Sequence, residues 1–186
     1  MATTRERHVG RVGIDDLEAL QTLRLNLSEQ DELLNAQTEC TFVFQNEQGW
    51  PSGVIMSFVR GNGAFWLTAV ETRPHAKALA LDPRVTLVVS NAGTGSPGRQ
   101  MIAIRGVALV HRDRPTKEWF FEQFTARMQP ADPHAFARLL DSPKRIVVEV
   151  RPVAIAVSHD SRKMPGNGRG GPGEAVAAAA TAGNAS

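Results

Sequence analysis

The chain has little cysteine, no long apolar run and almost no net charge. Its one cysteine, Cys40, cannot form an intrachain disulfide, which fits a reducing compartment. No stretch approaches the roughly 18 consecutive apolar residues of a membrane-spanning helix. The first eight residues are polar and lead into no apolar segment of the kind that marks a signal peptide. We therefore expect a cytoplasmic protein without a membrane partner.

The charges of the chain nearly cancel, because 21 Lys and Arg face 19 Asp and Glu, for a formal net charge of +2. This balance argues against a dedicated nucleic-acid surface, which needs a clustered basic face. The five histidines show no metal-ligand spacing, so no metal site is expected. Ser158-His-Asp-Ser161 holds the residue types of a catalytic triad, but neighbours on one extended run cannot form one. The sequence therefore singles out no catalytic residue.

The length of 186 residues favours a single domain with two terminal additions. Residues 1–38 are expected to form N-terminal helices: one over Asp15–Asn26, and a second capped by Ser28 with Leu33 and Leu34 buried. Residues 39–158 would form the main domain. From residue 159 to 186 the chain is rich in Gly and Ala without an apolar pattern, which predicts a flexible tail.

Short β-type runs separated by turns dominate the main domain. The predicted strands are Thr41–Phe44, Val54–Val59, Ala64–Val70, Arg84–Ser90, Gln100–His111, Ile146–Val150 and Val153–Ser158. Val54–Val59 and Ala64–Val70 would pair as a hairpin across Gly61-Asn-Gly63. Helices are expected over His75–Leu81, from Pro115 with a phenylalanine stripe, and from Asp132-Pro133 with Phe136, Leu139 and Leu140 inside. Short connections favour an antiparallel sheet, and six or seven such strands close into a barrel or sandwich.

The segment from Thr68 to Lys77 concentrates hydroxyls and cations at a turn that leads into a helix. It contains Thr68, Thr72, Arg73, His75 and Lys77 within ten residues. Such groups, together with free backbone N–H groups, suit a bound anion, and a phosphate is the obvious ligand. The same residues also fit a solvated, charged turn, and the segment alone does not decide between the two.

Four short motifs resemble the flavin-binding split barrels related to pyridoxamine-phosphate oxidase. They are Trp66-Leu-Thr68, Thr72-Arg73, Leu81-Asp-Pro-Arg-Val85 and Arg99-Gln100, within a match from about Thr41 to His111. The resemblance implies a mainly β fold with added helices: an antiparallel split β-barrel of six to seven strands. It also implies a dimer that holds its cofactor at the interface.

The resemblance assigns cofactor-binding roles residue by residue. Thr68 and Arg73 would bind the cofactor phosphate, and Gln100 would approach the flavin ring. Thr72 and Arg99, from the same motifs, are further cofactor-binding candidates. The family's lysine after the arginine is Pro74 here, and His75 and Lys77 would replace it.

The strand before the predicted hairpin departs from the oxidase. The oxidase has an arginine and a lysine where this chain has Ser52 and Ser57, and Ser57 is kept as a cofactor-binding candidate. This uncharged strand is similar to that of the actinobacterial deazaflavin-dependent branch. The oxidase's C-terminal arginine-rich substrate motif is missing, which speaks against pyridoxamine-phosphate oxidation. FMN and the deazaflavin coenzyme both remain open as the cofactor.

Three functions follow from this resemblance. The first is an FMN- or deazaflavin-dependent oxidoreductase that transfers hydride to or from a small organic substrate, since the cofactor would supply the chemistry. The second is a non-catalytic flavin- or haem-binding barrel for sensing, storage or haem handling. The third is a cofactor-free binding module. Three tryptophans and eight phenylalanines exceed what the inner faces need, which independently favours a homodimer.

Overall fold

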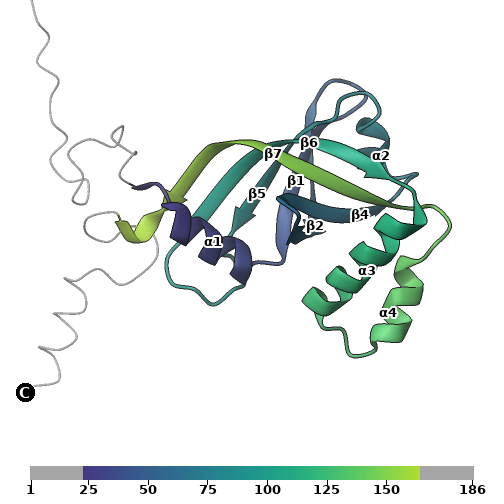
Figure 1. Cartoon of the computed structure of the whole chain (residues 1–186). Helices are drawn as coiled ribbons and strands as arrows, with labels where there is room; N and C mark the ends of the chain where they lie inside the picture. The colour runs from purple at the N-terminus through teal and green to yellow at the C-terminus, as the bar shows by residue number, and fades with distance from the viewer. Residues whose placement is uncertain (1–22, 164–186) are drawn as a thin grey trace, which may run out of the picture.

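The computed structural model describes residues 23–163 of the chain, which fold around one curled antiparallel sheet (Figure 1). Seven strands lie in the order β2-β1-β5-β6-β7-β4-β3. Their bounds are β1 Glu39–Gln45, β2 Pro51–Ser57, β3 Val59–Gly61, β4 Ala64–Val70, β5 Arg84–Ser90, β6 Gln100–His111 and β7 Arg145–Asp160. The helices are α1 Leu27–Ala36, α2 Pro74–Ala78, α3 Arg114–Met128 and α4 Pro133–Leu140, with the short turn η2 Ser161–Lys163 at the end. The predicted split barrel is confirmed.

The curl of the sheet encloses the main core. Alternate residues of the central strands point inward, among them Phe42, Leu67, Leu87, Ile102 and Val148, each at most 2% exposed. Leu33 and Leu34 of α1 close one end of this core, as predicted. A fully buried Val, Leu, Ile or Phe side chain contributes roughly 1.5–3 kcal/mol, so this cluster is the main source of stability.

A second, smaller core lies between the outer face of the sheet and the helices α3 and α4. Phe120, Phe121 and Phe124 of α3 pack there on Trp66 and Val147, which confirms the predicted phenylalanine stripe. Asp113 caps α3 and Asp132 caps α4, each accepting a hydrogen bond from a backbone N–H; of the two, the cap at Asp132 was predicted. Leu139 was predicted to be inside but is 66% exposed. The two helices cover only the part of the sheet near β3 and β4 (Figure 1).

Two sequence predictions are wrong, and a third lies mostly outside the described residues. Asn26, not Ser28, caps α1. Asn26 forms a capping box with Glu29: the Asn26 side chain accepts a hydrogen bond from the Glu29 N–H, and the Glu29 carboxylate accepts one from the Asn26 N–H. The predicted pairing of Val54–Val59 with Ala64–Val70 is also wrong: β2 pairs with β1, and only the three residues of β3 pair with β4. The predicted helix over Asp15–Asn26 lies outside the described residues up to residue 22, and Leu23–Asn26 are not α-helical.

The last strand is longer than predicted. The expected strands Ile146–Val150 and Val153–Ser158 are one strand, β7, which passes through Pro152 and continues to Asp160. The break at Pro152 is absent because the β6–β7 ladder is irregular there, and an irregular ladder tolerates proline. Residues 159–163 therefore belong to the fold rather than to the predicted tail. The rest of that tail, from residue 164, lies outside the described residues.

Candidate functional site

The segment that leads from β4 into α2 carries two cations, Arg73 and Lys77. Glu71 pairs with Arg112, whose Nε lies 2.7 Å from the Glu71 carboxylate, so the one acid of this turn is neutralised. Arg73 occupies the cap position of α2 in an extended conformation, and its side chain makes no capping hydrogen bond. Within residues 23–163, neither Arg73 nor Lys77 forms an ion pair. The turn therefore presents uncompensated positive charge.

His75 lies in the same turn but serves packing rather than charge. Its half-buried ring contacts Phe42 and Phe44 with centroid distances of 6.4 and 6.1 Å. Burial, and after it the charge of Arg73, lowers the pKa of His75, so that the ring is neutral at pH 7. Of the three basic residues from Arg73 to Lys77, Arg73 and Lys77 therefore supply the positive charge.

A cavity of about 520 Å³ adjoins Lys77, between α2 and the hairpin that joins β1 and β2. Pro74 and Lys77 line it from α2, and Phe44 and Ser52 line it from the hairpin. Glu47 also lines this cavity, so its charge is mixed. The space is large enough for a phosphate and part of the chain that carries it.

Two further predicted residues are placed less directly. Thr68 lies on β4, and its hydroxyl donates a 2.8 Å hydrogen bond to the Ile146 carbonyl of β7, so its proton is used within the sheet. Ser57 ends β2 opposite Glu39, five residues beyond the Ser52 that lines the cavity. At about 3.3 Å per residue, Ser57 lies roughly 17 Å along the strand from Ser52.

Arg99 and Gln100 lie at the other end of the sheet from α2. The strand β5 of seven residues runs between the two places, which corresponds to roughly 20 Å. The Gln100 side chain is buried and donates a 3.1 Å hydrogen bond to Asp160. The Arg99 backbone N–H donates to Ser161 Oγ at 2.8 Å. One chain thus holds the predicted site residues in two separate groups.

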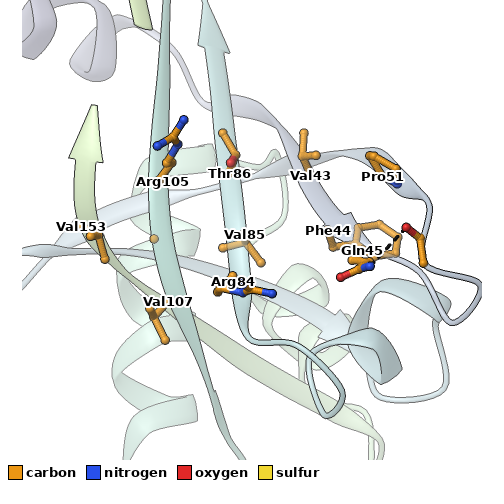
Figure 2. A pocket seen from close by; sticks show the side chains of 12 residues that line it. Val43, Phe44, Gln45, Pro51, Arg84, Val85, Thr86, Arg105, Val107 and Val153 are labelled. Carbon is orange, nitrogen blue, oxygen red and sulfur yellow. Dashed lines mark hydrogen bonds between the residues drawn. The ribbon is translucent and has the colours of Figure 1, made fainter. Parts of the chain in front are cut away.

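A second cavity, of about 500 Å³, opens on the outer face of the sheet, beside the same β1–β2 hairpin (Figure 2). The outward side chains of β1, β5, β6 and β7 form its floor. They include Val43, Thr86, Arg105, Val107 and Val153. This site was not predicted from the sequence. The only hint in the sequence is that several strands carry an apolar residue at an outward-facing position. These positions become neighbours only through the order in which the strands pair.

A third group of polar side chains borders the α3 end of this face. Glu149 is 6% exposed and accepts hydrogen bonds from His111 Nε2 at 2.8 Å and Arg151 Nε at 2.7 Å. Burial opposes its charge, but the bonds from Arg151 and His111 outweigh burial and lower the pKa of Glu149. Trp66 packs on His111 with a centroid distance of 5.5 Å. In the sequence, the indication of this polar group was Glu149, a single glutamate among the apolar residues 146–150.

Within the described residues, no group of three or more His, Cys, Asp or Glu side chains could hold a metal ion. In the same part of the chain, none of the helices is both long and apolar enough to cross a membrane. The cavities and the free cations of α2 and β6 are therefore the features that could bind a ligand.

Comparisons with known proteins give a consistent fold. The chain is similar to a conserved hypothetical protein from Mycobacterium tuberculosis, with a TM-score of 0.63, 19% identity, and coverage of 77% of this chain and 89% of that one. The heme storage protein HutZ from Vibrio cholerae matches with a TM-score of 0.62, 16% identity, and coverage of 74% and 97%. An F₄₂₀ reductase matches with a TM-score of 0.50, 19% identity, and coverage of 68% and 94%.

At these identities the structural likeness establishes the fold alone. No curated protein matches the chain in sequence. The family model described as pyridoxamine 5'-phosphate oxidase matches residues 27–159, which is most of the chain and nearly all of its described part. The chain therefore belongs to the pyridoxamine 5'-phosphate oxidase family.

Proposed function

We propose that this protein is an oxidoreductase that binds FMN or the deazaflavin coenzyme and exchanges hydride between that cofactor and a small organic substrate. The observation that carries the proposal is the placement of Lys77 on the wall of a cavity of about 520 Å³, with a second cation, Arg73, directly before the Pro74 that also lines it. A phosphate needs such donors, and each charged hydrogen bond contributes roughly 1.5–3 kcal/mol. The family and the F₄₂₀ reductase among its structural neighbours support the same class of cofactor.

The residues of the turn divide the work of binding. Arg73 and Lys77 hold the phosphate, and the exposed Thr72 supplies a hydroxyl donor next to them. His75, wedged on Phe42 and Phe44, fixes α2 against the barrel and keeps the two cations in place. When bound, the flavin-type ring supplies the hydride chemistry, which agrees with the absence of a catalytic triad from Ser158-His-Asp-Ser161.

We further propose that the protein is a homodimer with a cofactor at each interface site. In one chain Arg99 and Gln100 lie roughly 20 Å from the α2 turn, so a cofactor that meets both groups must draw on two subunits. Beside the second cavity, the outer face of β6 and of the second half of β7 also carries exposed apolar side chains. They are Leu109 and Val157. An exposed apolar surface of this kind suits a two-fold contact.

Titration of the purified full-length protein with FMN, the deazaflavin coenzyme and haem, followed by absorption and fluorescence, tests the proposal. We expect saturable binding of one flavin-type cofactor per chain. The reduced, loaded protein should then reoxidise faster with small organic acceptors than the free reduced cofactor does. Binding of haem without either flavin would instead support the non-catalytic haem-handling function, and binding of none would support a cofactor-free module.

A further inference from the structure

The floor of the outer-face cavity is a row of side chains that crosses neighbouring strands. Strand pairing sets Val43 on β1 opposite Thr86 on β5, and Thr86 opposite Arg105 on β6. Figure 2 shows these three side chains in sequence across the sheet. The row therefore presents a methyl surface, then a hydroxyl, then a guanidinium.

Arg105 is the available cation of this cavity. The other arginine that lines it, Arg84, donates hydrogen bonds from Nε and Nη2 to both oxygens of Asp82, at 2.6–3.1 Å. These bonds hold the pKa of Asp82 at about 2, so the pair stays neutral as a whole. Arg105 has no ion pair with any residue from 23 to 163. No carboxylate lines this cavity, so its net charge comes from Arg105.

The backbone beside Arg105 is irregular in a way that shapes the cavity. The β6–β7 ladder shifts register between Ala103 and Ile104, and again between Arg105 and Gly106. At the second shift Val153 is the extra residue of β7, and it lines the cavity with 70% of its surface exposed. Such bulges re-aim side chains and recur next to binding sites.

Gly106 is needed for this second shift. A Cβ atom there would lie 2.5 Å from Val150 Cγ1 and 2.8 Å from the Arg151 carbonyl oxygen. The close approach of β6 and β7 thus depends on glycine at the position directly after Arg105. Arg105 and Val153 therefore lie on the two strands of one β-bulge, not on a regular stretch of the ladder.

We infer that the outer-face cavity binds an organic acid: a ligand with one anionic group, held by Arg105 and Thr86, and an apolar body that rests on Val43, Val107 and Val153. As the substrate site of the enzyme, this inference rests on the proposed function. As an acid-binding site it stands on the cavity itself. The volume of about 500 Å³ fits a small ligand with one or two rings. A guanidinium recognises a carboxylate through paired N–H donors, which also fixes the orientation of the acid.

Binding of naphthoate and of naphthamide to the full-length protein tests the inference, because the two probes share shape and differ in charge. We expect wild type to bind naphthoate about ten- to a hundredfold more tightly than naphthamide, the range of one charged hydrogen-bond pair. Arg105→Gln should remove this preference and leave naphthamide affinity unchanged. Arg105→Lys should keep part of it, and Thr86→Val should weaken naphthoate binding several-fold. Arg138→Gln, on α4, is the matched control and should change nothing.

Three results would overturn the inference: no binding of either probe, a naphthoate preference that survives Arg105→Gln, or a change of oligomeric state in that variant, which would assign Arg105 to a subunit contact. Cofactor titration of the same proteins separates this failure from failure of the proposed function. If the protein binds naphthoate through Arg105 but binds no flavin, the acid-binding site is supported and the oxidoreductase function is refuted. If it binds flavin but does not prefer naphthoate to naphthamide, the oxidoreductase function is supported and the acid-binding site is refuted.

Discussion

Gln100 and Asp160 face each other where β6 begins and β7 ends, and the Gln100 amide donates a 3.1 Å hydrogen bond to the fully buried Asp160 carboxylate. Arg162 adds three hydrogen bonds to the same carboxylate from its Nε and Nη2, at 2.6–3.0 Å. The side chain that the family resemblance assigned to the flavin ring therefore also holds the end of the barrel together.

Asp160→Asn should destabilise the protein by about 1.5–3 kcal/mol at pH 7, because the hydrogen bonds lose their charge. Burial opposes the charged form of Asp160, but the bonds from Arg162 and Gln100 outweigh burial and lower its pKa. A lowered carboxyl pKa stabilises the fold above the unfolded pKa of about 4, and this contribution is lost as pH falls through the folded pKa. Urea unfolding from pH 7 to pH 3 should show the gap between wild type and variant closing at low pH. A gap independent of pH would refute the assignment, and Glu122→Gln, on the exposed side of α3, is the control.

Residues 159–163 should contribute measurably to stability. Ser161 accepts a hydrogen bond from the Arg99 N–H and donates its own N–H to the Arg99 carbonyl. Lys163 Nζ lies 2.6 Å from Glu29 on α1. A chain that ends at Ser158 should be about 3 kcal/mol less stable than one that ends at Lys163, which lowers the melting temperature by roughly 6–12 °C. Equal melting temperatures would mean that these contacts contribute nothing.

Arg73→Ala should weaken cofactor binding by about ten- to a hundredfold, since it removes one charged contact to the phosphate. Lys77→Ala should act in the same direction. Lys144→Ala, which changes an exposed lysine that lines neither cavity, should leave the affinity unaltered. Fluorescence titration with each flavin provides the measurement, and unchanged affinity in Arg73→Ala would show that the phosphate binds elsewhere.

Gly106→Ala should cost about 1–3 kcal/mol of stability, because its methyl group would overlap Val150 and the Arg151 carbonyl. Thermal and urea unfolding measure the loss. Gly53→Ala is a suitable comparison, since its Cβ would meet Thr41 Cγ2 at 3.0 Å and no other atom closer than 3.9 Å. A variant at Gly106 as stable as the one at Gly53 would mean that β6 and β7 separate easily at this point.

Leu109→Asp combined with Val157→Asp should convert the proposed dimer to a monomer, because it places charge in the apolar outer face. Light scattering at micromolar concentration, with and without cofactor, measures the mass. Leu139→Asp, which alters a leucine on α4 that is 66% exposed, should stay dimeric. Wild type that is a monomer and still binds flavin tightly would refute the interface model and the two-chain site with it.

The sequence predicts those strands best that alternate regularly between buried and exposed positions. The bounds of β6 were predicted correctly as Gln100–His111, because Ile102, Ile104 and Ala108 share one face. The partner of β4 was not predicted correctly, because the residues before β4 contain two turn signals, at 46–49 and at 61–63, and either could join β2 to its partner. The choice between them depends on closure of the barrel, where the Phe58 N–H donates to the Thr38 carbonyl and separates β2 from β3.

The candidate site was only partly predictable for a related reason. The cations of the α2 turn are close in sequence, so composition reveals them. The outer-face cavity combines Val43, Thr86, Arg105 and Val153 from four strands, and only their register makes them neighbours. Gln100 was not predictable for a different reason. Nothing in the sequence indicated that its polar side chain would be buried in a hydrogen bond to Asp160.

The strand β7 is held on both sides as far as Val150, but from Arg151 to Asp160 its ladder is formed with β6 alone. This half of the strand contains both register shifts and is fastened at its tip by the Asp160 cluster. Amide hydrogen exchange should therefore be uneven along a single strand. Protons near Ile146–Val150 should exchange only when the whole domain unfolds, and those between Val153 and Val157 should exchange through a local opening. Loss of the Asp160 bonds would release this half from its free end, and the lining of the acid-binding cavity would move with it.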